Sequence, residues 1–279
     1  MSKTQASKSI GTIDHVVIVV DGLDAAADVY RQLGFTLSPR GRHGAALGTE
    51  NHTIMLRDDY FELLSVLTPT PRNAQWRKVI AGGGGVAGMA LRTDDPVGAQ
   101  QHWLAAGLVP DTPLRFSREV PRPDGSTLQA RFEVVSLDET EGLGVRVFVC
   151  SQPTREAVWL PELLTHANTA IGIRCVHIAC PDPEFSAAQW RRVMPSAQAR
   201  STPGGVTLDT GGHTIMLTED GSPRVRALGI DYVVADLASC RAVLQRNAIA
   251  HTDDDGMLTV PASQACNVAV RFQTAQSRA

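Results

Sequence analysis

The sequence predicts an α+β fold made of four βαβββ modules arranged as two pairs. Residues 13–66 run from an apolar strand through an alanine-rich helix to further short strands, and the same order returns from residues 86, 172 and 226. The pentapeptide His-Thr-Ile-Met-Leu also occurs twice, at 52–56 and 213–217, within strand-like segments. Chance is a poor explanation for such a repeat, so the pattern indicates internal duplication.

The first module defines the pattern. Ile13–Val20 is apolar and β-branched, as in a strand buried on both faces, and Asp21 opens a run with helical apolar spacing that ends at Gly34. Asp58-Asp59 is a tight-turn signal between two of the strands that follow. The strands predicted after the helix are Thr36–Pro39, Thr53–Arg57 and Tyr60–Val66.

The module order divides the chain into two predicted domains. The first covers residues 13–164, with modules at 13–66 and 86–150, a linker at 67–85 and a connector at 151–164. The second covers residues 165–272, with modules at 172–220 and 226–272, and polar tails lie at 1–12 and 273–279. A Pro123-Asp124-Gly125 turn joins two strands of the second module. Cutting the chain near Thr165–Thr169 should then give two separately soluble halves.

Composition and motifs exclude several classes of function. The net charge of −3 and the absence of a basic run argue against a nucleic-acid partner. No apolar stretch reaches the roughly 18 residues of a membrane span, and the N-terminus has no signal-peptide core, so a soluble cytoplasmic protein is expected. The odd cysteine count without a C-x-x-C pair predicts neither disulfides nor a zinc ribbon. No nucleotide-binding glycine motif is present, and a homodimer is permitted but not required.

His15 and Glu62 are the candidate catalytic residues. If both point to one face they could bind a divalent metal such as zinc, iron, manganese or nickel. Without a metal, burial disfavours the charge of a carboxylate, which suits Glu62 to act as a general base while His15 orients it or shares the proton. The competing interpretation is that both are structural strand residues. A catalytic zinc site uses about three protein ligands, so a third would have to come from His43, His52 or elsewhere.

Four other residues are candidates for substrate binding. Glycines at 41, 44 and 48 let the loop backbone approach a ligand, and Arg42 offers a planar fork for a carboxylate or phosphate. Arg42 could equally be a solvated loop residue, and Asn51 could cap a turn. Strand alternation places Tyr60 on the same face as Glu62. The predicted substrate-binding residues are Arg42, His43, Asn51 and Tyr60.

These residues resemble a known family pattern. The series Gly41-Arg42-His43, then Gly48-Thr49 with Asn51, then Tyr60 with Glu62, is similar to the glyoxalase-like branch of the vicinal oxygen chelate superfamily; the first glycine of that pattern is Arg40 here. The resemblance implies that the first-strand His and last-strand Glu bind a metal in a cup-shaped sheet. The segment Thr165–Asn168 resembles a His-Pro-Asn motif of the same branch, with Ala167 in place of the proline.

The other modules lack the ligand pair. Alignment on the helix-start aspartates puts Gly88 at the His15 position and Phe148 or Cys150 opposite Glu62. In the third module it puts Val176 at the ligand position, so His177 should point away from the cup unless a bulge intervenes. In the fourth module Arg271 stands where related sequences often carry the glutamate. The ligand set of the extradiol dioxygenases is therefore absent from the second half.

Two functions follow. The first is a lyase or isomerase that acts on a carbonyl or enolisable small molecule in the cup of the first two modules, with or without a metal. The second is a protein of the same fold that binds or sequesters a small molecule without chemistry. Retention of His15, His43 and Glu62 favours the enzyme, and the loss of ligands in three modules favours the binding protein.

Overall fold

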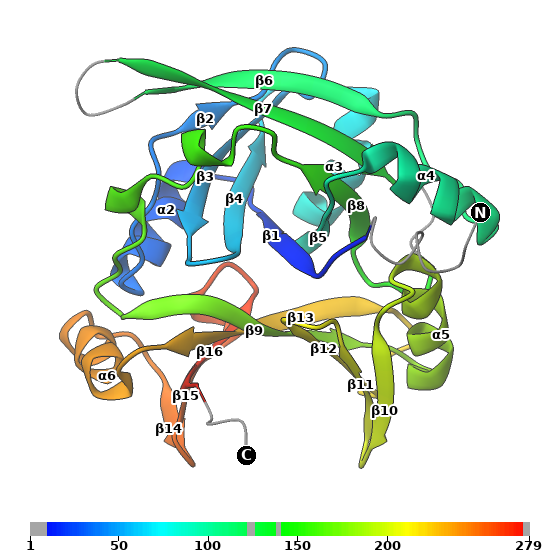
Figure 1. Ribbon diagram of the computed structural model, residues 1–279. Helices are drawn as coiled ribbons and strands as arrows, with labels where there is room; N and C mark the ends of the chain where they lie inside the picture. Colours follow the sequence, from blue (N-terminus) through cyan, green and yellow to red (C-terminus); the bar gives the residue numbers. More distant parts are fainter. Residues whose placement is uncertain (1–9, 122–125, 138–140, 276–279) are drawn as a thin grey trace. The chain divides into compact units, whose positions relative to one another are not determined.

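The computed structural model describes residues 10–121, 126–137 and 141–275 (Figure 1). The predicted turn Pro123-Asp124-Gly125 lies outside the described residues, as do most of the N-terminal tail and residues 276–279.

The first two modules form one mixed sheet of eight strands in the order β2-β3-β4-β1-β5-β8-β7-β6. The first module consists of β1 (Ile13–Val19), α2 (Leu23–Gln32), β2 (Gly41–Arg42), β3 (Thr49–Met55) and β4 (Tyr60–Val66). The second module consists of β5 (Gly85–Arg92), α4 (Pro96–Ala105), β6 (Leu114–Pro121), β7 (Thr127–Ser136) and β8 (Arg146–Ser151). Between them lie η1 (Pro71–Asn73) and α3 (Ala74–Ala81).

The last two modules form a second eight-stranded sheet with the same topology, β10-β11-β12-β9-β13-β16-β15-β14. The third module consists of β9 (Ala170–Ala179), α5 (Pro183–Val193), β10 (Gln198–Thr202), β11 (Gly205–Asp209) and β12 (Thr214–Thr218). The fourth consists of β13 (Arg226–Val234), α6 (Leu237–Arg246), β14 (Thr252–Asp254), β15 (Met257–Val260), η4 (Ala262–Gln264) and β16 (Ala269–Thr274). The connector before β9 holds η2 (Arg155–Ala157) and η3 (Pro161–Leu163).

This architecture confirms the predicted fold class. Each module runs strand, helix, then three strands. The first and last strands of a module pair in parallel, as in β5·β8 and β13·β16, whereas its last three strands pair antiparallel. The first strand is central and nearly all buried, which explains its continuous apolar sequence.

The prediction for the middle strands of the first module was wrong in position. Residues 36–39 form no strand, because Pro39 has no N–H to donate and the Ser38 carbonyl pairs with the His52 side chain instead of with a backbone N–H. The short β2 at Gly41–Arg42 takes the place of that strand. The next strand also begins earlier than predicted, at Thr49 rather than Thr53, and includes Asn51.

The chain forms two compact units, each of which takes modules from both halves of the sequence. The first unit comprises Met1–Val16, Ala87–Val158 and His177–Ala227, and the second comprises Val17–Val86, Trp159–Val176 and Leu228–Ala279. The second and third modules thus share a unit, as do the first and fourth. The predicted domain boundary at residues 164 and 165 stays a prediction.

Aromatic side chains fill the core of the second unit. The Phe35 ring lies 5.1 Å from Phe61, 5.2 Å from Tyr232 and 5.9 Å from Phe272, measured between ring centroids. Tyr232 is fully buried, and burial raises its pKa well above the usual value. It is therefore a core residue and not an available proton donor. Within the described residues, no helix is long and apolar enough to cross a membrane.

The predicted Thr165–Asn168 motif attaches the connector to the first module. The backbone N–H of Thr36 donates to Nδ1 of His166 (2.9 Å), so Nε2 carries the hydrogen and donates to the carbonyl of Met55 (2.8 Å). Asn168 donates to the carbonyl of Leu33 (2.9 Å). Burial lowers the pKa of His166, although the Met55 carbonyl partly opposes that shift. His166 therefore has a structural role, and we call its bonds to Thr36 and Met55 the His166 clip.

Candidate functional site

Glu62 and Asn51 form the hydrogen-bonded centre of the site on β3 and β4. In the antiparallel register Thr53 lies opposite Glu62 and Asn51 lies opposite Leu64, which places both side chains on one face. The Asn51 amide donates to Oε2 of Glu62 at 2.5 Å, and both residues are buried. The Asn51 amide thus fixes one carboxylate oxygen of Glu62 in place.

Tyr60 shares this face, and the connector packs against it. The ring of Trp159 meets the Tyr60 ring edge-on at 5.4 Å, and the Trp159 indole N–H donates to the carbonyl of Leu56. Tyr60 is only 4% exposed. The wall beside Glu62 is therefore aromatic, as strand alternation predicted.

The loop candidates lie apart from Glu62. Nδ1 of His43 pairs with the hydroxyl of Thr49 (2.7 Å), whereas the Arg42 side chain is 72% exposed, with its Nε 3.8 Å from Glu50. His52 alternates with Asn51 along β3 and its Nδ1 pairs with the carbonyl of Ser38 (2.7 Å). The partners described for Arg42 and His43 are thus Glu50 and Thr49, and His52 is directed to the face opposite Asn51 and Glu62.

His15 is oriented by a neighbour that the sequence patterns did not single out. Nδ1 of His15 lies 2.8 Å from Oδ2 of Asp14, and both side chains are buried. An ionised carboxylate can only accept, so Nδ1 must carry the hydrogen. Nε2 is then the nitrogen that can accept a proton or bind a metal.

Asp14 is held in its ionised form by donors around it. Gln152 donates to Oδ2 at 2.7 Å, while Arg92 Nε and Arg155 Nη1 lie 3.3 and 3.8 Å from Oδ1. Burial alone would raise the pKa of Asp14, but its hydrogen bond with His15 and the charges of His15 and Arg92 outweigh burial, so the pKa is lowered. Asp14 is the main site residue that sequence reasoning missed.

Backbone hydrogen bonds identify equivalent positions in the modules. Val20 N–H donates to the carbonyl of Leu64, and Thr93 N–H donates to the carbonyl of Cys150 in the same way. The residue two before each acceptor is Glu62 in the first module and Phe148 in the second. Of the two residues offered by sequence alignment, Phe148 is therefore the counterpart of Glu62.

The structure of the third module corrects the alignment of that module made from the sequence. In this module the Cys180 N–H donates to the Thr218 carbonyl, as the Val20 N–H donates to the Leu64 carbonyl in the first module. His15 lies five residues before Val20, and the residue five before Cys180 is Cys175. Cys175, not Val176, therefore takes the His15 position. His177 then lies two residues further along β9, on the same face as Cys175. The earlier alignment on Asp21 was one residue off, because the helix N-cap equivalent to Asp182 is Gly22.

In the fourth module an ion pair includes the position of the expected glutamate. Arg271 lies opposite Asp231 in the parallel register of β13 and β16, and its Nη1 is 3.3 Å from Oδ1 of Asp231. The cationic side chain occupies the position expected for a ligand glutamate. Among these equivalent positions, the His and Glu pair is retained in the first module alone.

Three neighbouring side chains, His15 among them, carry atoms that could bind the expected metal. Ligand atoms of Asp14, His15 and Cys150 lie within 4.8 Å of one another. Both oxygens of Asp14 already face Arg92, Gln152 and His15, so this carboxylate fits an orienting role better than a ligand role. Cys150, whose thiol suits zinc or iron, is a candidate third donor beside His15.

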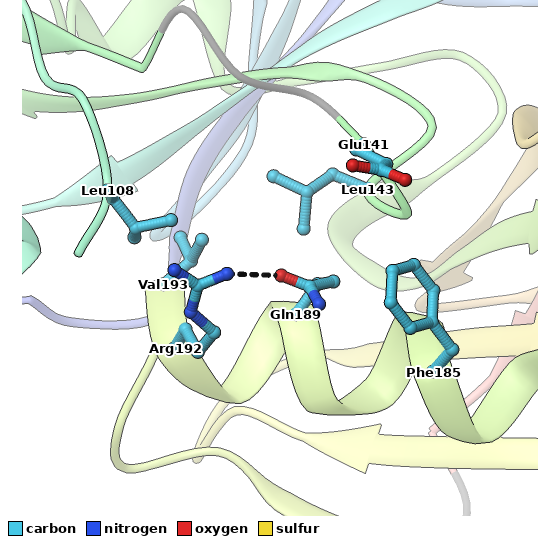
Figure 2. Close-up of a pocket in the computed structure, with 7 residues that line it drawn as sticks. All are labelled: Leu108, Glu141, Leu143, Phe185, Gln189, Arg192 and Val193. Atoms are coloured by element: carbon cyan, nitrogen blue, oxygen red, sulfur yellow. Dashed lines mark hydrogen bonds between the residues drawn. The ribbon is translucent and has the colours of Figure 1, made fainter. Parts of the chain in front are cut away.

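A separate pocket of about 230 Å³ lies in the first unit (Figure 2). It is lined by Leu108, Glu141, Leu143, Phe185, Gln189, Arg192 and Val193. Arg192 donates to Gln189 Oε1 (2.7 Å) and to the carbonyls of Ala106 and Gly107 at the end of α4. The guanidinium thus holds α5 against the end of α4, and none of the predicted site residues reaches this pocket.

Comparison with known proteins agrees with the topology. The model of the glyoxalase-like domain family matches residues 13–194, more than half of the chain. A search of curated proteins found no match.

Three solved structures share the fold at low sequence identity. A hypothetical protein from Staphylococcus aureus has a TM-score of 0.69 at 12% identity, over 95% of this chain and 99% of that chain. A mutant of 4-hydroxymandelate synthase from Streptomyces coelicolor has a TM-score of 0.61 at 13% identity, over 97% and 94%. A homoprotocatechuate 2,3-dioxygenase variant from B. fuscum has a TM-score of 0.61 at 12% identity, over 97% and 72%. At such identity these likenesses show the fold alone. With the family match and the paired βαβββ modules together, the chain belongs to the glyoxalase-like domain family and has the vicinal oxygen chelate fold.

Proposed function

We propose that the protein is a small-molecule lyase or isomerase that removes a proton beside a carbonyl group. The observation that carries the proposal is the buried Glu62 carboxylate, fixed through Oε2 by the Asn51 amide. A positioned carboxylate with one oxygen directed away from its support can take a proton from a carbon acid. The Asn51 bond holds the base in one orientation and so reduces the entropic cost of reaching the transition state.

His15 is the second member of the proposed site. Val20 N–H bonds the Leu64 carbonyl, so strand alternation leads us to expect Glu62 and Leu64 on the same face as His15 and Val17. With Nδ1 committed to Asp14, Nε2 of His15 would hold the substrate oxygen or return the proton.

We further propose that a divalent metal can bind at this site. His15 and Glu62 would hold it, with Cys150, whose sulfur lies close to the His15 ring nitrogens, as a further donor. The metal would polarise the substrate oxygen. Elemental analysis of protein purified without a His-tag or chelator tests this part of the proposal. Stoichiometric metal in the wild type that is lost in His15→Ala and in Glu62→Gln supports the site. Metal retained by both variants contradicts it.

The variant Glu62→Gln tests the base. Glutamine keeps the shape and can still accept from Asn51, but it cannot take a proton, so we expect turnover to fall on the order of 100-fold or more while binding persists. A thermal-shift screen of metabolites would first identify a ligand, and product formation would then be measured. Glu50→Gln is the matched control, because Glu50 is a buried carboxylate on β3 that lies on the face opposite Asn51, near Arg40 and Arg42.

The second candidate function is a protein that binds a small molecule without chemistry. The residues Phe148 and Arg271 at the positions equivalent to Glu62 favour it. A ligand that stabilises wild type and Glu62→Gln alike, yet is never transformed by wild type with added metal, would establish this alternative.

A further inference from the structure

The strand β6 forms one edge of the first sheet and is eight residues long. It pairs with β7, and among the described residues no strand lies on its outer side (Figure 1). Proteins usually protect such an edge by shortening the strand or by placing charges on it, because an open edge can pair with another chain. An edge of this length is therefore a candidate interaction surface.

The other three edge strands, β2, β10 and β14, are protected in these ways. β2 has two residues, and β14 has three, of which Asp253 and Asp254 are acidic. β10 has five residues with Arg200 at its centre, so pairing with its own copy about that centre would place two guanidinium groups opposite each other. β6 differs from them, because it is long and carries charges of both signs.

One hydrogen bond shows which backbone groups of β6 face outward. The N–H of Arg131 on β7 donates to the hydroxyl of Thr154 (2.8 Å), which follows β8, so this N–H points away from β6. Arg131 lies opposite Ser117, and two residues paired in an antiparallel ladder direct their N–H and C=O groups either both toward or both away from each other. Ser117 therefore directs its N–H and C=O to the outer edge, and alternation gives Arg115 and Glu119 the same direction.

The side chains of these three residues are accessible. Arg115, Ser117 and Glu119 are all exposed, and they share one face of the hairpin. The Arg115 side chain is 77% exposed and pairs with Glu133 of β7, whereas the Glu119 carboxylate accepts from the neutral amide of Gln129 at 3.4 Å. Opposite charges thus lie two residues to either side of Ser117.

We propose that β6 pairs antiparallel with β6 of a second copy of this chain, about a two-fold axis at Ser117. This register places Arg115 of each copy opposite Glu119 of the other, and these pairs, like the central Ser117 pair, each exchange two backbone hydrogen bonds. A register centred on Arg118 would place two arginines opposite each other, and one centred on Phe116 would lose both charged pairs. The sheets of the two copies would continue as one across the axis.

Sedimentation velocity of the full chain from about 1 to about 300 μM tests the pairing. An interface one strand wide is smaller than the roughly 1,600 Å² of a standard protein complex, so we expect a concentration-dependent dimer with a dissociation constant on the order of 10 μM. Ser117→Pro removes an outward N–H without removing a bond to β7. It should weaken the dimer about tenfold or more, while the circular dichroism spectrum stays that of the wild type.

Charge reversals test the register. Arg115→Glu alone places a glutamate opposite Glu119 of the second copy, and Glu119→Arg alone places an arginine opposite Arg115, so each variant should be monomeric at concentrations where the wild type is dimeric. An equimolar mixture of the two variants should dimerise, because both opposite-charge pairs form between the unlike copies. Arg200→Glu is the matched control, since it reverses an exposed arginine on the edge strand β10 and should leave the dimer unchanged.

A wild type that stays monomeric at about 300 μM would overturn the proposal and would assign the edge to an extended segment of another protein. A mixture of the two charge variants that stays monomeric would overturn the register, and so would a dimer that Arg200→Glu weakens as much as they do. If Ser117→Pro lowers the melting temperature, the mixture decides, because the charge variants change only exposed side chains.

Discussion

At the scale of single residues, the role of Asp14 is the least expected feature. It is nearly fully buried, it accepts from Gln152 and it is joined to His15 through Nδ1. A carboxylate that fixes the tautomer of a functional histidine usually matters almost as much as the histidine itself. Replacing Asp14 therefore tests how the His15 ring is oriented while the ring itself stays in place.

Asp14→Asn should release the tautomer of His15. The wild-type ring should show a protonated Nδ1 and a basic Nε2 in nitrogen NMR, whereas the variant should show a mixture, because a neutral amide can donate as well as accept. Turnover or metal affinity should fall roughly 10- to 100-fold. Asp111→Asn is the control, since Asp111 is a carboxylate of the same unit that lies near an arginine, Arg146, instead of His15. An unchanged tautomer in Asp14→Asn would show that Asp14 does not orient the ring.

The sequence could indicate His15 and Glu62, because each falls at a fixed place in a repeated module. It could not indicate that Asp14 and Cys150 both lie beside the His15 ring. Asp14 adjoins His15 along a strand, where alternation predicts opposite faces, and Cys150 comes from a strand more than 130 residues away. Such contacts depend on side-chain rotamers and on sheet pairing, which no local pattern encodes.

At the scale of elements, helices were easier to predict than short strands. The module order predicts a helix after β5, and α4 begins at Pro96 with Asp95 as its N-cap, the residue type that favours this position. The sequence Asp255-Gly256 is typical of the turn before β15, because both residues there have positive φ values, which Asp and Gly tolerate. The two-residue strand β2 could not be predicted from local sequence, because it is defined by its pairing with β3.

The His166 clip gives the connector a measurable pH dependence. Burial lowers its pKa, so between that value and the unfolded value near 6.5 the unfolded chain binds more protons. The contribution of His166 to stability is complete above about pH 6.5 and is lost as the pH falls. His166→Gln can keep both hydrogen bonds without titrating, so its free energy of unfolding should change less with pH below 6.5 than that of the wild type.

Chemical denaturation at several pH values between 5 and 8 would measure this difference. His166→Ala, which loses bonds to Thr36 and Met55, should be destabilised by about 2 kcal/mol at neutral pH. His251→Gln serves as the control because its Nδ1 pairs only two residues away, with the Ile249 carbonyl. If the free energy of unfolding changes equally with pH in His166→Gln and in the wild type, His166 does not contribute to stability as a neutral hydrogen-bonding residue.

At the scale of the whole molecule, the compact units change the expectation for separated halves. The module pattern alone suggests that a cut near residues 165–169 would leave two independent domains. In the structure, however, Phe35 and Phe61 from the first module pack against Tyr232 and Phe272 from the fourth. The Trp103 indole likewise donates to the Val193 carbonyl (3.0 Å), which links the second module to the third.

We therefore expect residues 1–165 and 166–279 to fail to fold when produced separately. Each fragment would expose aromatic surface that its partner buries, and burying an aromatic side chain contributes roughly 2 to 3 kcal/mol. Co-expressed fragments should recover the native circular dichroism spectrum and elute together in gel filtration. As a control, a protease site placed in the 165–169 segment and cut after folding should leave the two pieces associated. Two well-dispersed NMR spectra from separate monomeric fragments would instead restore the independent domains that the module pattern suggests, and would mean that the aromatic core between the first and fourth modules adds little to the stability of either.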